Sequence, residues 1–397
     1  KRIINPGTEQ LRQPAVIISN HQSFLDILVS TMLHPKVILL TNQWVWRSPV
    51  FGSVVRLADY YPVADGAEGA IEKLRQRVNQ GYSIVVYPEG TRSPDPVIKR
   101  FHKGAFYIAE QLGLDILPMV IHGTAYTMSK GDFLLKDGTV SVKYLPRIAQ
   151  SDKAWGDNYS ARTKNISRYF KQQYELLRAE TEVPAYFREQ LKYNFIYKGP
   201  VLEWYMRIKT RMEGNYRLFH ELLPQEGRIL DIGCGYGFMD YMLAWTSPGR
   251  TITGIDYDEE KIATAAHCYQ KPGQLQFIHG DISATPFEKY DAFILSDVLH
   301  YLPADEQETL LQQCIERLLP GGVIIVRDGD SDMTKRHEGT RFTEFMSTRV
   351  IGFNKVKQER LSFFSAAHVR GLVSKYGAVA EQIDNTRYTS NVIFVIK

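Results

Sequence analysis

The fold of the second half of this chain is decided by Arg228-Ile229-Leu230-Asp231-Ile232-Gly233-Cys234-Gly235-Tyr236-Gly237. An apolar run ends there in an acidic residue and a glycine-rich turn, and residues 238–245 continue with the apolar pattern of a helix. Glycines in such a turn let the backbone pass beneath a ligand that a Cβ atom would push away. The stretch therefore predicts a sheet strand that leads into a ligand-binding turn.

Further apolar strands follow, and each ends in a polar residue. The strand at residues 251–255 ends in Asp256, about 20 residues beyond the glycine turn, where an acidic side chain reaches a ribose diol. Pro320-Gly321-Gly322 then turns into a strand at residues 323–326. The strand ends between these two hold the candidate binding residues Asp281, Ile282 and Ser296.

The spacing of the glycines bears on the cofactor. A dehydrogenase turn needs Gly-x-Gly-x-x-Gly to seat a pyrophosphate at a helix N-terminus. Phe238 occupies the last glycine position here, so a ligand without pyrophosphate fits better. The alternative is a doubly wound sheet that binds no cofactor.

Taken together, these motifs resemble the class I S-adenosylmethionine-dependent methyltransferases over roughly residues 200–397. The resemblance implies a Rossmann-like seven-stranded sheet with a hairpin of residues 377–383 and 390–396, and S-adenosyl-L-methionine as cofactor. It assigns Asp256 to the ribose, Asp281 and Ile282 to the adenine, and to the methionine moiety Asp231, Gly233, Gly235 and Gly237. It also makes His300 a candidate contact of the methyl acceptor, although His300 could equally be a satisfied histidine at a helix end.

In the first half, Asn20-His21-Gln22-Ser23-Phe24-Leu25-Asp26 follows an apolar strand at residues 15–18 and enters a helix at residues 24–32. Asp26 could hold the His21 imidazole in one tautomer and stabilise the imidazolium that forms when it takes a proton from an alcohol. Two structural interpretations stay open. Ser23 and Asp26 also fit a helix capping box, and a lone histidine near a strand end is usually structural.

A second turn, Tyr87-Pro88-Glu89-Gly90-Thr91-Arg92-Ser93, follows a strand at residues 84–86. Backbone N–H groups, hydroxyls and a guanidinium that converge in one turn suit a phosphate or a developing oxyanion. An ordinary surface turn with an exposed arginine is the alternative.

Both turns together resemble the glycerolipid acyltransferases, which acylate glycerol 3-phosphate and lysophosphatidate. Residues 103–106 and 117–120 extend the match to about residues 10–150. The resemblance implies an acyl-CoA or acyl-ACP donor, catalytic roles for His21, Asp26 and Glu89, and acceptor phosphate binding by Gly90, Thr91, Arg92 and Ser93. The family's second-block arginine has no basic counterpart at residues 60–65, which opens the possibility of another acyl acceptor.

Composition sets further bounds. A chain of 397 residues with a net charge of +4 fits two or three globular domains. No apolar run reaches the roughly 18 residues of a membrane span. The start at Lys1, without Met or signal peptide, suggests a piece of a longer polypeptide. Three cysteines without paired spacing indicate a reducing compartment and predict neither a disulfide nor a metal site.

For two aromatic segments the sequence allows two different environments each. Residues 151–220 interleave basic and aromatic residues, which suits either an anionic membrane leaflet or a solvated helical connector. No recognition motif accompanies them, so nucleic acid is not an expected partner. Residues 43–52 carry tryptophans and a phenylalanine that could meet acyl chains or lie in the core.

We therefore expect an α/β chain with an acyltransferase-like domain at residues 1–183, a helical lead-in at 184–220 and a methyltransferase domain at 221–397. The expected function is a fusion of two enzymes that acylates a (lyso)phospholipid-like hydroxyl and methylates a lipid or an aromatic or polyene-type small molecule. One alternative keeps only the methyltransferase active, beside a lipid-binding module. Another is a scaffold of two inactive folds. The expected location is the cytoplasmic side of a bacterial inner membrane, with acyl carrier protein and an exporter domain as candidate partners.

Overall fold

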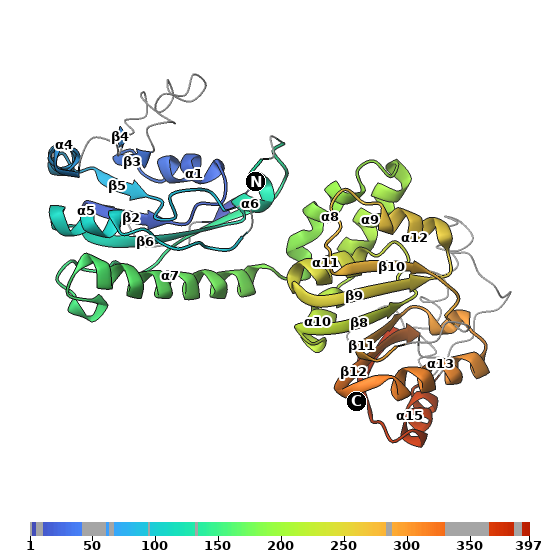
Figure 1. Ribbon diagram of the computed structural model, residues 1–397. Coiled ribbons are helices and arrows are strands. Elements are labelled where there is room, and N and C mark those ends of the chain that lie inside the picture. The colour runs from blue at the N-terminus through green and yellow to red at the C-terminus, as the bar shows by residue number, and fades with distance from the viewer. Residues whose placement is uncertain are drawn as a thin grey trace. The chain divides into compact units, whose positions relative to one another are not determined.

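A computed structural model of the chain describes residues 2–4, 11–41, 61–62, 67–93, 96–131, 134–282, 288–329, 365–384 and 391–397. The chain divides into two compact units, Lys1–Thr181 and Glu182–Lys397 (Figure 1). Each unit is built around its own sheet.

The sheet of the first unit has seven strands in the order β1-β7-β6-β2-β5-β3-β4 (Figure 1). β7 runs antiparallel to β6, and every other neighbouring pair is parallel. The strands are β1 (Arg2–Ile4), β2 (Ala15–Ser19), β3 (Val37–Thr41), β4 (Tyr61–Pro62), β5 (Ser83–Val86), β6 (Asp115–His122) and β7 (Thr139–Tyr144). Because β2 and β5 are parallel neighbours, their carboxyl ends meet at the same edge of the sheet.

Helices cover both faces of this sheet. Because successive side chains of a strand point to opposite faces, alternate residues of β2 contact different helices. Val16 and Ile18 of β2 pack in the core that includes α5 and α7, whereas Ala15 and Ile17 pack in the core that includes α1. Figure 1 shows α1 and α7 on opposite sides of the sheet. The helices are α1 (Leu25–Leu33), α4 (Ala67–Asn79), α5 (Gly104–Leu112), α6 (Thr124–Thr127), η1 (Lys153–Trp155) and α7 (Tyr159–Thr181).

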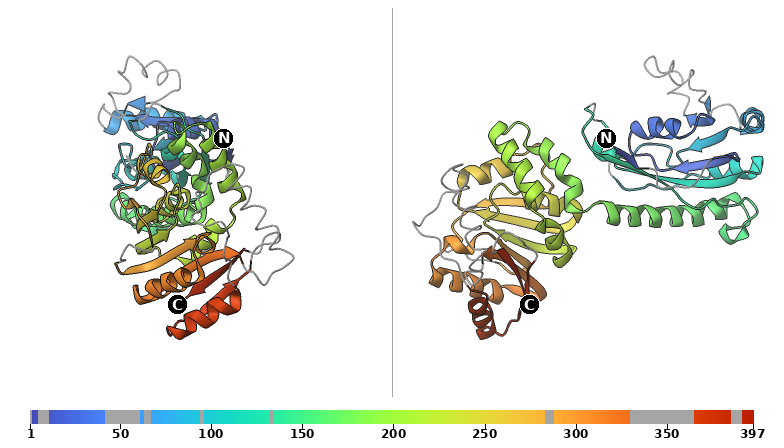
Figure 2. Two further views of the ribbon diagram at one scale, coloured as in Figure 1. Left: turned by 90° about the vertical axis from the view of Figure 1, so that its right-hand side faces the viewer. Right: turned by 180° about the vertical axis from the view of Figure 1, so that it is seen from behind.

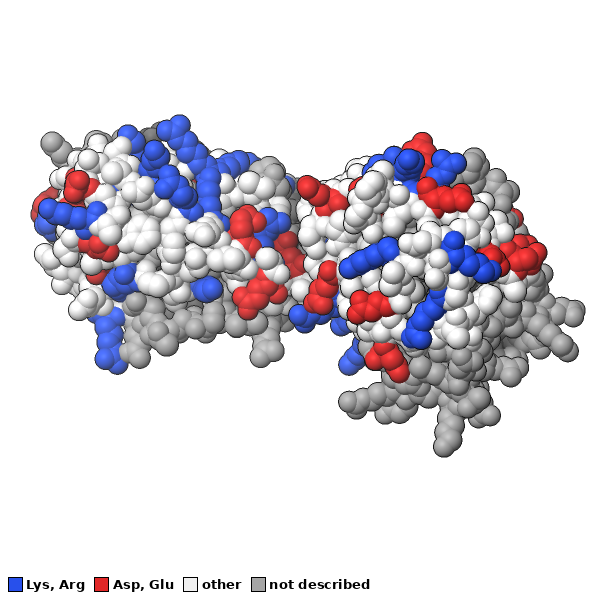
Figure 3. Space-filling view, turned by 90° about the horizontal axis from the view of Figure 1, so that it is seen from below, with Lys and Arg blue, Asp and Glu red and all other residues white. Residues whose placement is uncertain are grey.

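α7 belongs to the core of the first unit. Its aromatic residues Phe170 and Tyr174 are fully buried there. The Arg162 guanidinium donates hydrogen bonds to the carbonyls of Ala149, Gln150 and Asp152, at 2.9, 3.2 and 2.9 Å. These contacts fit a structural connector for this part of the segment. On the face seen in Figure 3 the described residues carry both signs of charge.

The sheet of the second unit has seven strands in the order β10-β9-β8-β11-β12-β14-β13 (Figures 1 and 2). β14 runs antiparallel to both of its neighbours, and the other pairs are parallel. This arrangement confirms the predicted Rossmann-like sheet and its terminal hairpin. The strands are β8 (Glu226–Ile232), β9 (Gly249–Asp256), β10 (Leu275–His279), β11 (Tyr290–Ser296), β12 (Leu318–Gly329), β13 (Ala380–Ile383) and β14 (Asn391–Ile396).

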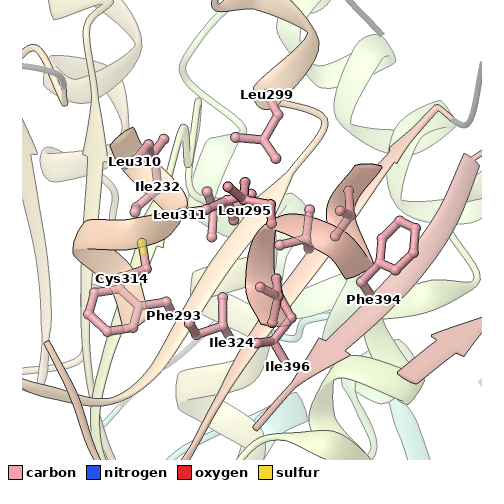
Figure 4. Packing of buried hydrophobic residues seen from close by; sticks show 14 of the residues in the cluster. Ile232, Phe293, Leu295, Leu299, Leu310, Leu311, Cys314, Ile324, Phe394 and Ile396 are labelled. Carbon is pink, nitrogen blue, oxygen red and sulfur yellow. The ribbon is translucent and has the colours of Figure 1, made fainter. Parts of the chain in front are cut away.

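Helices pack on this sheet through buried apolar side chains. In Figure 4, Cys314 of α13 lies beside Phe293 of β11, and Leu310 of the same helix lies beside Ile232 of β8. Proline begins both η2 and α9, where its fixed φ suits the first residue of a helix. The helices are η2 (Pro184–Phe187), α8 (Arg188–Phe195), α9 (Pro200–Met212), α10 (Asn215–Leu222), α11 (Phe238–Thr246), α12 (Glu259–Ala266), η3 (Leu299–Tyr301), α13 (Ala304–Glu316) and α15 (Ala366–Lys375).

One strand begins earlier than the sequence predicted. Pro320-Gly321-Gly322 lies inside β12, where the pairing with β11 jumps from Leu318 to Val323. Gly321 has a φ of +79°, and a Cβ atom on Gly322 would lie 2.6 Å from a backbone oxygen. Glycine is therefore needed at Gly321 and Gly322, where β12 has more residues than the paired segment of β11. Among the described residues, no helix is long and apolar enough to cross a membrane.

Candidate active sites

The predicted histidine and carboxylate of the first unit lie in hydrogen-bond contact. His21 follows the end of β2, and its Nδ1 donates to Asp26 Oδ2 at 3.1 Å. The same oxygen accepts the backbone N–H groups of Gln22 and Ser23, at 2.6 and 2.7 Å. Asp26 is fully buried. It serves both interpretations, because it accepts the Ser23 N–H as the acid of a capping box does and also orients the imidazole.

The imidazole is also held from the side. The Tyr87 ring stacks on the His21 ring with centroids 4.3 Å apart and planes 22° from parallel. Tyr87 is itself fixed, since its hydroxyl lies 2.8 Å from Ser30 Oγ. The His21 side chain remains 14% exposed. Since Nδ1 is occupied by Asp26, Nε2 is the nitrogen that can meet a substrate hydroxyl.

Glu89 joins the two predicted turns. It is 3% exposed, and it accepts the His21 N–H at 2.7 Å, the Ser93 hydroxyl at 3.0 Å and the Lys99 N–H at 2.7 Å. Burial raises the pKa of Glu89, and these three hydrogen bonds oppose the increase. Its contacts are those of a residue that shapes the turn, and its predicted place in the catalytic set stays a prediction.

The second turn lies against the first. The Ser93 N–H donates to the His21 carbonyl at 2.8 Å. Gly90 has a φ of +69°, which favours glycine at this position. Gly90 and Thr91 are exposed, Arg92 is half-buried and Ser93 is buried. The structure thus brings the predicted base and the predicted anion-binding turn together.

Two lysines that sequence reasoning missed converge on this turn. The Nζ atoms of Lys99 and Lys130 lie 3.4 and 3.1 Å from the Arg92 carbonyl oxygen. Lys130 is brought close by a long-range contact, because Ser23 Oγ donates to the Met128 carbonyl at 2.7 Å. These two ammonium groups and Arg92 make the turn cationic, although no motif in the sequence links them.

Asn20 is a further buried support that the sequence did not single out. Its amide exchanges hydrogen bonds of 2.7 and 2.9 Å with the backbone of Ile121, which ties the end of β2 to β6. The aromatic segment at residues 43–52 lies outside the described residues, as does the slot without a basic residue at 60–65 apart from Tyr61 and Pro62.

In the second unit the glycine turn has the conformation that its motif predicted. Gly235 has a φ of +57°, and a Cβ atom added there would meet nothing within 4 Å. A Cβ atom on Gly233 would instead lie 2.3 Å from Val298, and one on Gly237 2.4 Å from Phe277. Gly235 therefore leaves open space for a ligand, whereas Gly233 and Gly237 allow close packing.

One cavity gathers most of the predicted cofactor residues at the carboxyl ends of the parallel strands. Neither Gly237 nor His300 is among the residues that line it. The predicted residues that do line it are Asp231, Gly233, Gly235, Asp256, Asp281, Ile282 and Ser296. This is where open α/β sheets bind ligands.

Asp256 ends β9 at the wall of this cavity. Its two carboxylate oxygens accept the N–H groups of Gly235 and Asp258, at 2.8 and 2.9 Å. A carboxylate has about four acceptor positions, so two remain for a ligand diol. The same side chain can thus shape the glycine turn and bind a hydroxyl pair.

A buried acid lies behind Asp231 and was missed by the sequence analysis. Asp240, in the first turn of α11, is fully buried, and its charge acts on Asp231. Burial raises the pKa of Asp240 to about 7. Burial, followed by the charge of Asp240, raises the pKa of Asp231. The pair therefore tends to hold one proton.

His300 has a carboxylate partner of its own. Its Nδ1 donates to Asp328 Oδ1 at 2.6 Å, and its backbone N–H donates to Asp328 Oδ2 at 3.1 Å. The His300 side chain is 2% exposed. Its neighbours Val298 and Tyr301 line the cavity. The contact with a methyl acceptor stays a prediction.

Comparison with known proteins assigns a family segment to each unit. The family model described as Acyltransferase matches residues 2–122, and the model described as Methyltransferase domain matches residues 229–322. Both predicted resemblances are thus confirmed.

A relative and two solved structures are similar to parts of the chain. The 1-acyl-sn-glycerol-3-phosphate acyltransferase of Limnanthes alba is 32% identical over 153 residues, which is 37% of this chain and 54% of the relative. The chain thus spans about half the length of this curated relative. The acyltransferase PlsC of Thermotoga maritima is 24% identical over 44% of this chain and 72% of its own, with a TM-score of 0.39. Human N-acetylserotonin methyltransferase, solved with SAM, is 19% identical over 51% of this chain and 57% of its own, with a TM-score of 0.39.

The Asp231–Asp240 pair predicts a pH-dependent stability. The pKa of Asp240 lies above its ordinary value of 3.8 in the folded state, so the stability of the second unit falls as pH rises from 3.8 towards about 7. Asp240→Asn removes the titrating carboxyl group and with it this loss of stability. We expect the thermal unfolding midpoint of the variant to exceed that of the wild type at pH 8, by about 2–4 °C for each kcal/mol, and the gain to shrink at pH 5.

Thermal melts of the full chain at both pH values measure this difference. Asp305→Asn, at an exposed position of α13, is the control that should show no such change between pH 5 and pH 8. A midpoint difference between Asp240→Asn and the wild type that is the same at both pH values would contradict the shared proton.

Proposed function

We propose that this chain, which joins an acyltransferase-family segment to a methyltransferase domain, transfers an acyl group to a hydroxyl of a (lyso)phospholipid-like acceptor and a methyl group to a lipid or an aromatic or polyene-type small molecule. The observation that carries the first activity is the His21–Asp26 hydrogen bond beside the cationic turn at Arg92. The observation that carries the second is the cavity that unites the glycine turn with Asp256.

In the proposed acyl transfer, His21 Nε2 takes the proton of the acceptor hydroxyl while the oxygen attacks the thioester carbonyl of acyl-CoA or acyl-ACP. Asp26 stabilises the imidazolium that results. When the tetrahedral intermediate collapses, the thiolate leaves and His21 returns the proton to it. The acyl group ends as an ester on the acceptor oxygen.

The cationic turn can stabilise the negative charge of the acceptor or of the oxyanion that forms during acyl transfer. An acceptor phosphate or a developing oxyanion is negative, and Arg92 is flanked by the ammonium groups of Lys99 and Lys130. Glu89 holds the turn in register with His21 through its hydrogen bonds to His21 and Ser93. The proposed base and the proposed anion site therefore lie next to each other.

The residues of the second cavity fit S-adenosyl-L-methionine. Gly235 leaves room for close approach, Asp256 retains acceptors for a ribose diol, and Asp281 with Ile282 lies on the adenine side that the resemblance implies. When bound, the cofactor supplies a methyl group on a sulfonium. This chain's residues then bind and orient the two reactants and exclude water between them.

We further infer that α9 lies on an anionic membrane leaflet on the cytoplasmic side. Val201, Trp204 and Ile208 form an exposed apolar stripe on this helix, at 63%, 54% and 37% exposure. The basic residues Arg207 and Arg211 flank it and are exposed. Apolar residues beside basic ones are typical of helices at an anionic interface. The same helix also lines the cavity, which would place a lipid acceptor near its site.

The acyl transfer predicts a strict requirement for His21. We expect His21→Ala to lower thioester consumption by the full chain about 10²–10⁴-fold, because the base is lost. The assay measures free thiol released from acyl-CoA or acyl-ACP with a lysophospholipid acceptor. His34→Ala, just after α1, is the matched control. Wild-type turnover by His21→Ala would refute the mechanism, and a wild type that binds lipid without consuming thioester would favour the lipid-binding module.

The methyl transfer predicts cofactor binding through Asp256. We expect Asp256→Asn to weaken S-adenosylhomocysteine binding about 10-fold to 100-fold, because a charge-assisted hydrogen bond to the ribose becomes neutral. Calorimetry on the full chain measures the affinity, and Glu259→Gln on the exposed start of α12 is the control. A wild type without affinity would support the scaffold alternative.

The membrane proposal predicts that Trp204 contributes to vesicle binding. We expect the full chain to co-sediment with phosphatidylglycerol vesicles more than with phosphatidylcholine vesicles. Trp204→Glu should reduce the bound fraction severalfold, since it places a charge in the apolar stripe. Tyr269→Glu changes an aromatic residue of similar exposure, at 61%, outside the stripe and should bind like the wild type. Equal binding by wild type and Trp204→Glu would contradict the role of α9.

A further inference from the structure

The cavity of the second unit extends across the ends of several strands, and its two sides carry different chemistry. In the sheet, β9 and β10 lie on one side of β8, and β11 and β12 lie on the other. Asp256 ends β9 and Asp281 follows β10, so the proposed nucleoside site lies on the first side. Asp297 follows β11 and lines the second side. The second side is therefore where a methyl acceptor can meet the cofactor.

A buried tyrosine faces this second side. Tyr216, in the first turn of α10, lines the cavity and is 8% exposed. It lies close enough to Arg327 of β12 that the two charges interact. Burial raises the pKa of the Tyr216 hydroxyl, so the group stays protonated and can donate a hydrogen bond. Among the described residues this hydroxyl has no hydrogen-bond partner. Since a buried phenol is usually paired, the cavity must supply its partner.

The charged groups beside Tyr216 balance one another. Arg327 forms ion pairs with Glu213, at 3.5 Å, and with Asp297. The charges of the same two carboxylates also act on Lys209. Two cations thus face two carboxylates, and within the described part of the chain no excess positive charge remains here for a phosphate. An anionic ligand would lose its hydration beside Glu213 and Asp297, which is costly.

Apolar side chains complete this side of the cavity. Val298 and Leu302 come shortly after β11, and both line the cavity together with Tyr301. Ligand sites of this kind combine an apolar wall with a few polar groups that fix the orientation of the ligand. The wall and the Tyr216 hydroxyl together match an uncharged molecule that has an apolar body and an oxygen atom.

We propose that the Tyr216 hydroxyl donates a hydrogen bond to an oxygen of the methyl acceptor, and that the acceptor is uncharged where it meets α10. This inference rests on the proposed methyl transfer. It narrows the acceptor to an apolar molecule that presents a carbonyl, ether or hydroxyl oxygen, and it makes a phosphate head group an unfavourable ligand at this point. Tyr216 orients the acceptor and takes no proton from it.

Three small probes of similar size separate these properties. Acetophenone carries one carbonyl oxygen, ethylbenzene carries no oxygen, and benzoate is an anion at neutral pH. Ligand-observed NMR on the full chain with saturating S-adenosylhomocysteine measures their affinities. We expect Tyr216→Phe to weaken acetophenone binding about 3-fold to 10-fold, as for one neutral hydrogen bond, and to leave ethylbenzene binding unchanged. The wild type should bind benzoate more weakly than acetophenone.

Tyr257→Phe is the matched control, because Tyr257 lines the same cavity directly after Asp256. It should leave acetophenone binding unchanged. Calorimetry should also show that Tyr216→Phe binds S-adenosylhomocysteine like the wild type, which verifies that the variant is folded. A loss of S-adenosylhomocysteine binding in Tyr216→Phe alone would place Tyr216 in the cofactor site and overturn the inference.

The other outcomes separate this inference from the proposed function. If the wild type does not bind S-adenosylhomocysteine, the proposed methyl transfer itself fails. If the wild type binds it but does not bind acetophenone, or if Tyr216→Phe affects acetophenone and ethylbenzene equally, the role of Tyr216 is overturned while cofactor binding stands. Tighter binding of benzoate than of acetophenone would overturn the uncharged acceptor in favour of an anion such as a lipid phosphate.

Discussion

Parallel strand pairing sets where chemistry can occur in both units of this chain. In the first unit Ile18 of β2 pairs with Val86 of β5, so the residues that follow both strands leave the sheet at one edge. In the second unit Ile232 of β8 pairs with Ile255 of β9 in the same way. Each pair then makes a direct link beyond the strands, from His21 to Glu89 and from Gly235 to Asp256. The register of the sheet thus places the reactive groups.

Buried carboxylates hold both sites in shape. Asp26, Glu89 and Asp256 are each less than a tenth exposed, and each accepts at least two backbone N–H groups. Such hydrogen bonds offset the cost of burying a charge and order the loops that bear the functional groups. A structural role and a proposed chemical role therefore coincide in one side chain, which explains why Asp26 fitted both a capping box with Ser23 and a catalytic pair with His21.

The sequence predicted what local pattern determines and missed what long-range contacts determine. The apolar periods at residues 15–18 and 24–32 predicted β2 and α1 to within one residue, and the glycine spacing predicted the turn after β8. Lys130 reaches the Arg92 turn only because residues more than a hundred positions apart are hydrogen-bonded. Lys209, which also lines the cavity, was missed although its spacing from Tyr205 was visible, because its helix lies between the two groups of motifs in the sequence. His300 was predicted from its position, but η3 pairs its side chain with Asp328.

The two sites differ in the way that their proposed reactions require. Acyl transfer moves a proton, and the first unit provides an imidazole with one nitrogen fixed and the other available. Methyl transfer from a sulfonium needs orientation and charge matching more than a base, and the second unit provides acids and a lysine set in a cavity. That lysine sits on a helix that Arg327 ties to the strand ends through Glu213 and Asp297. Because the Arg327 side chain is itself only 11% exposed, these ion pairs hold the end of α9 against the strand ends and so fix the part of the cavity wall that α9 forms.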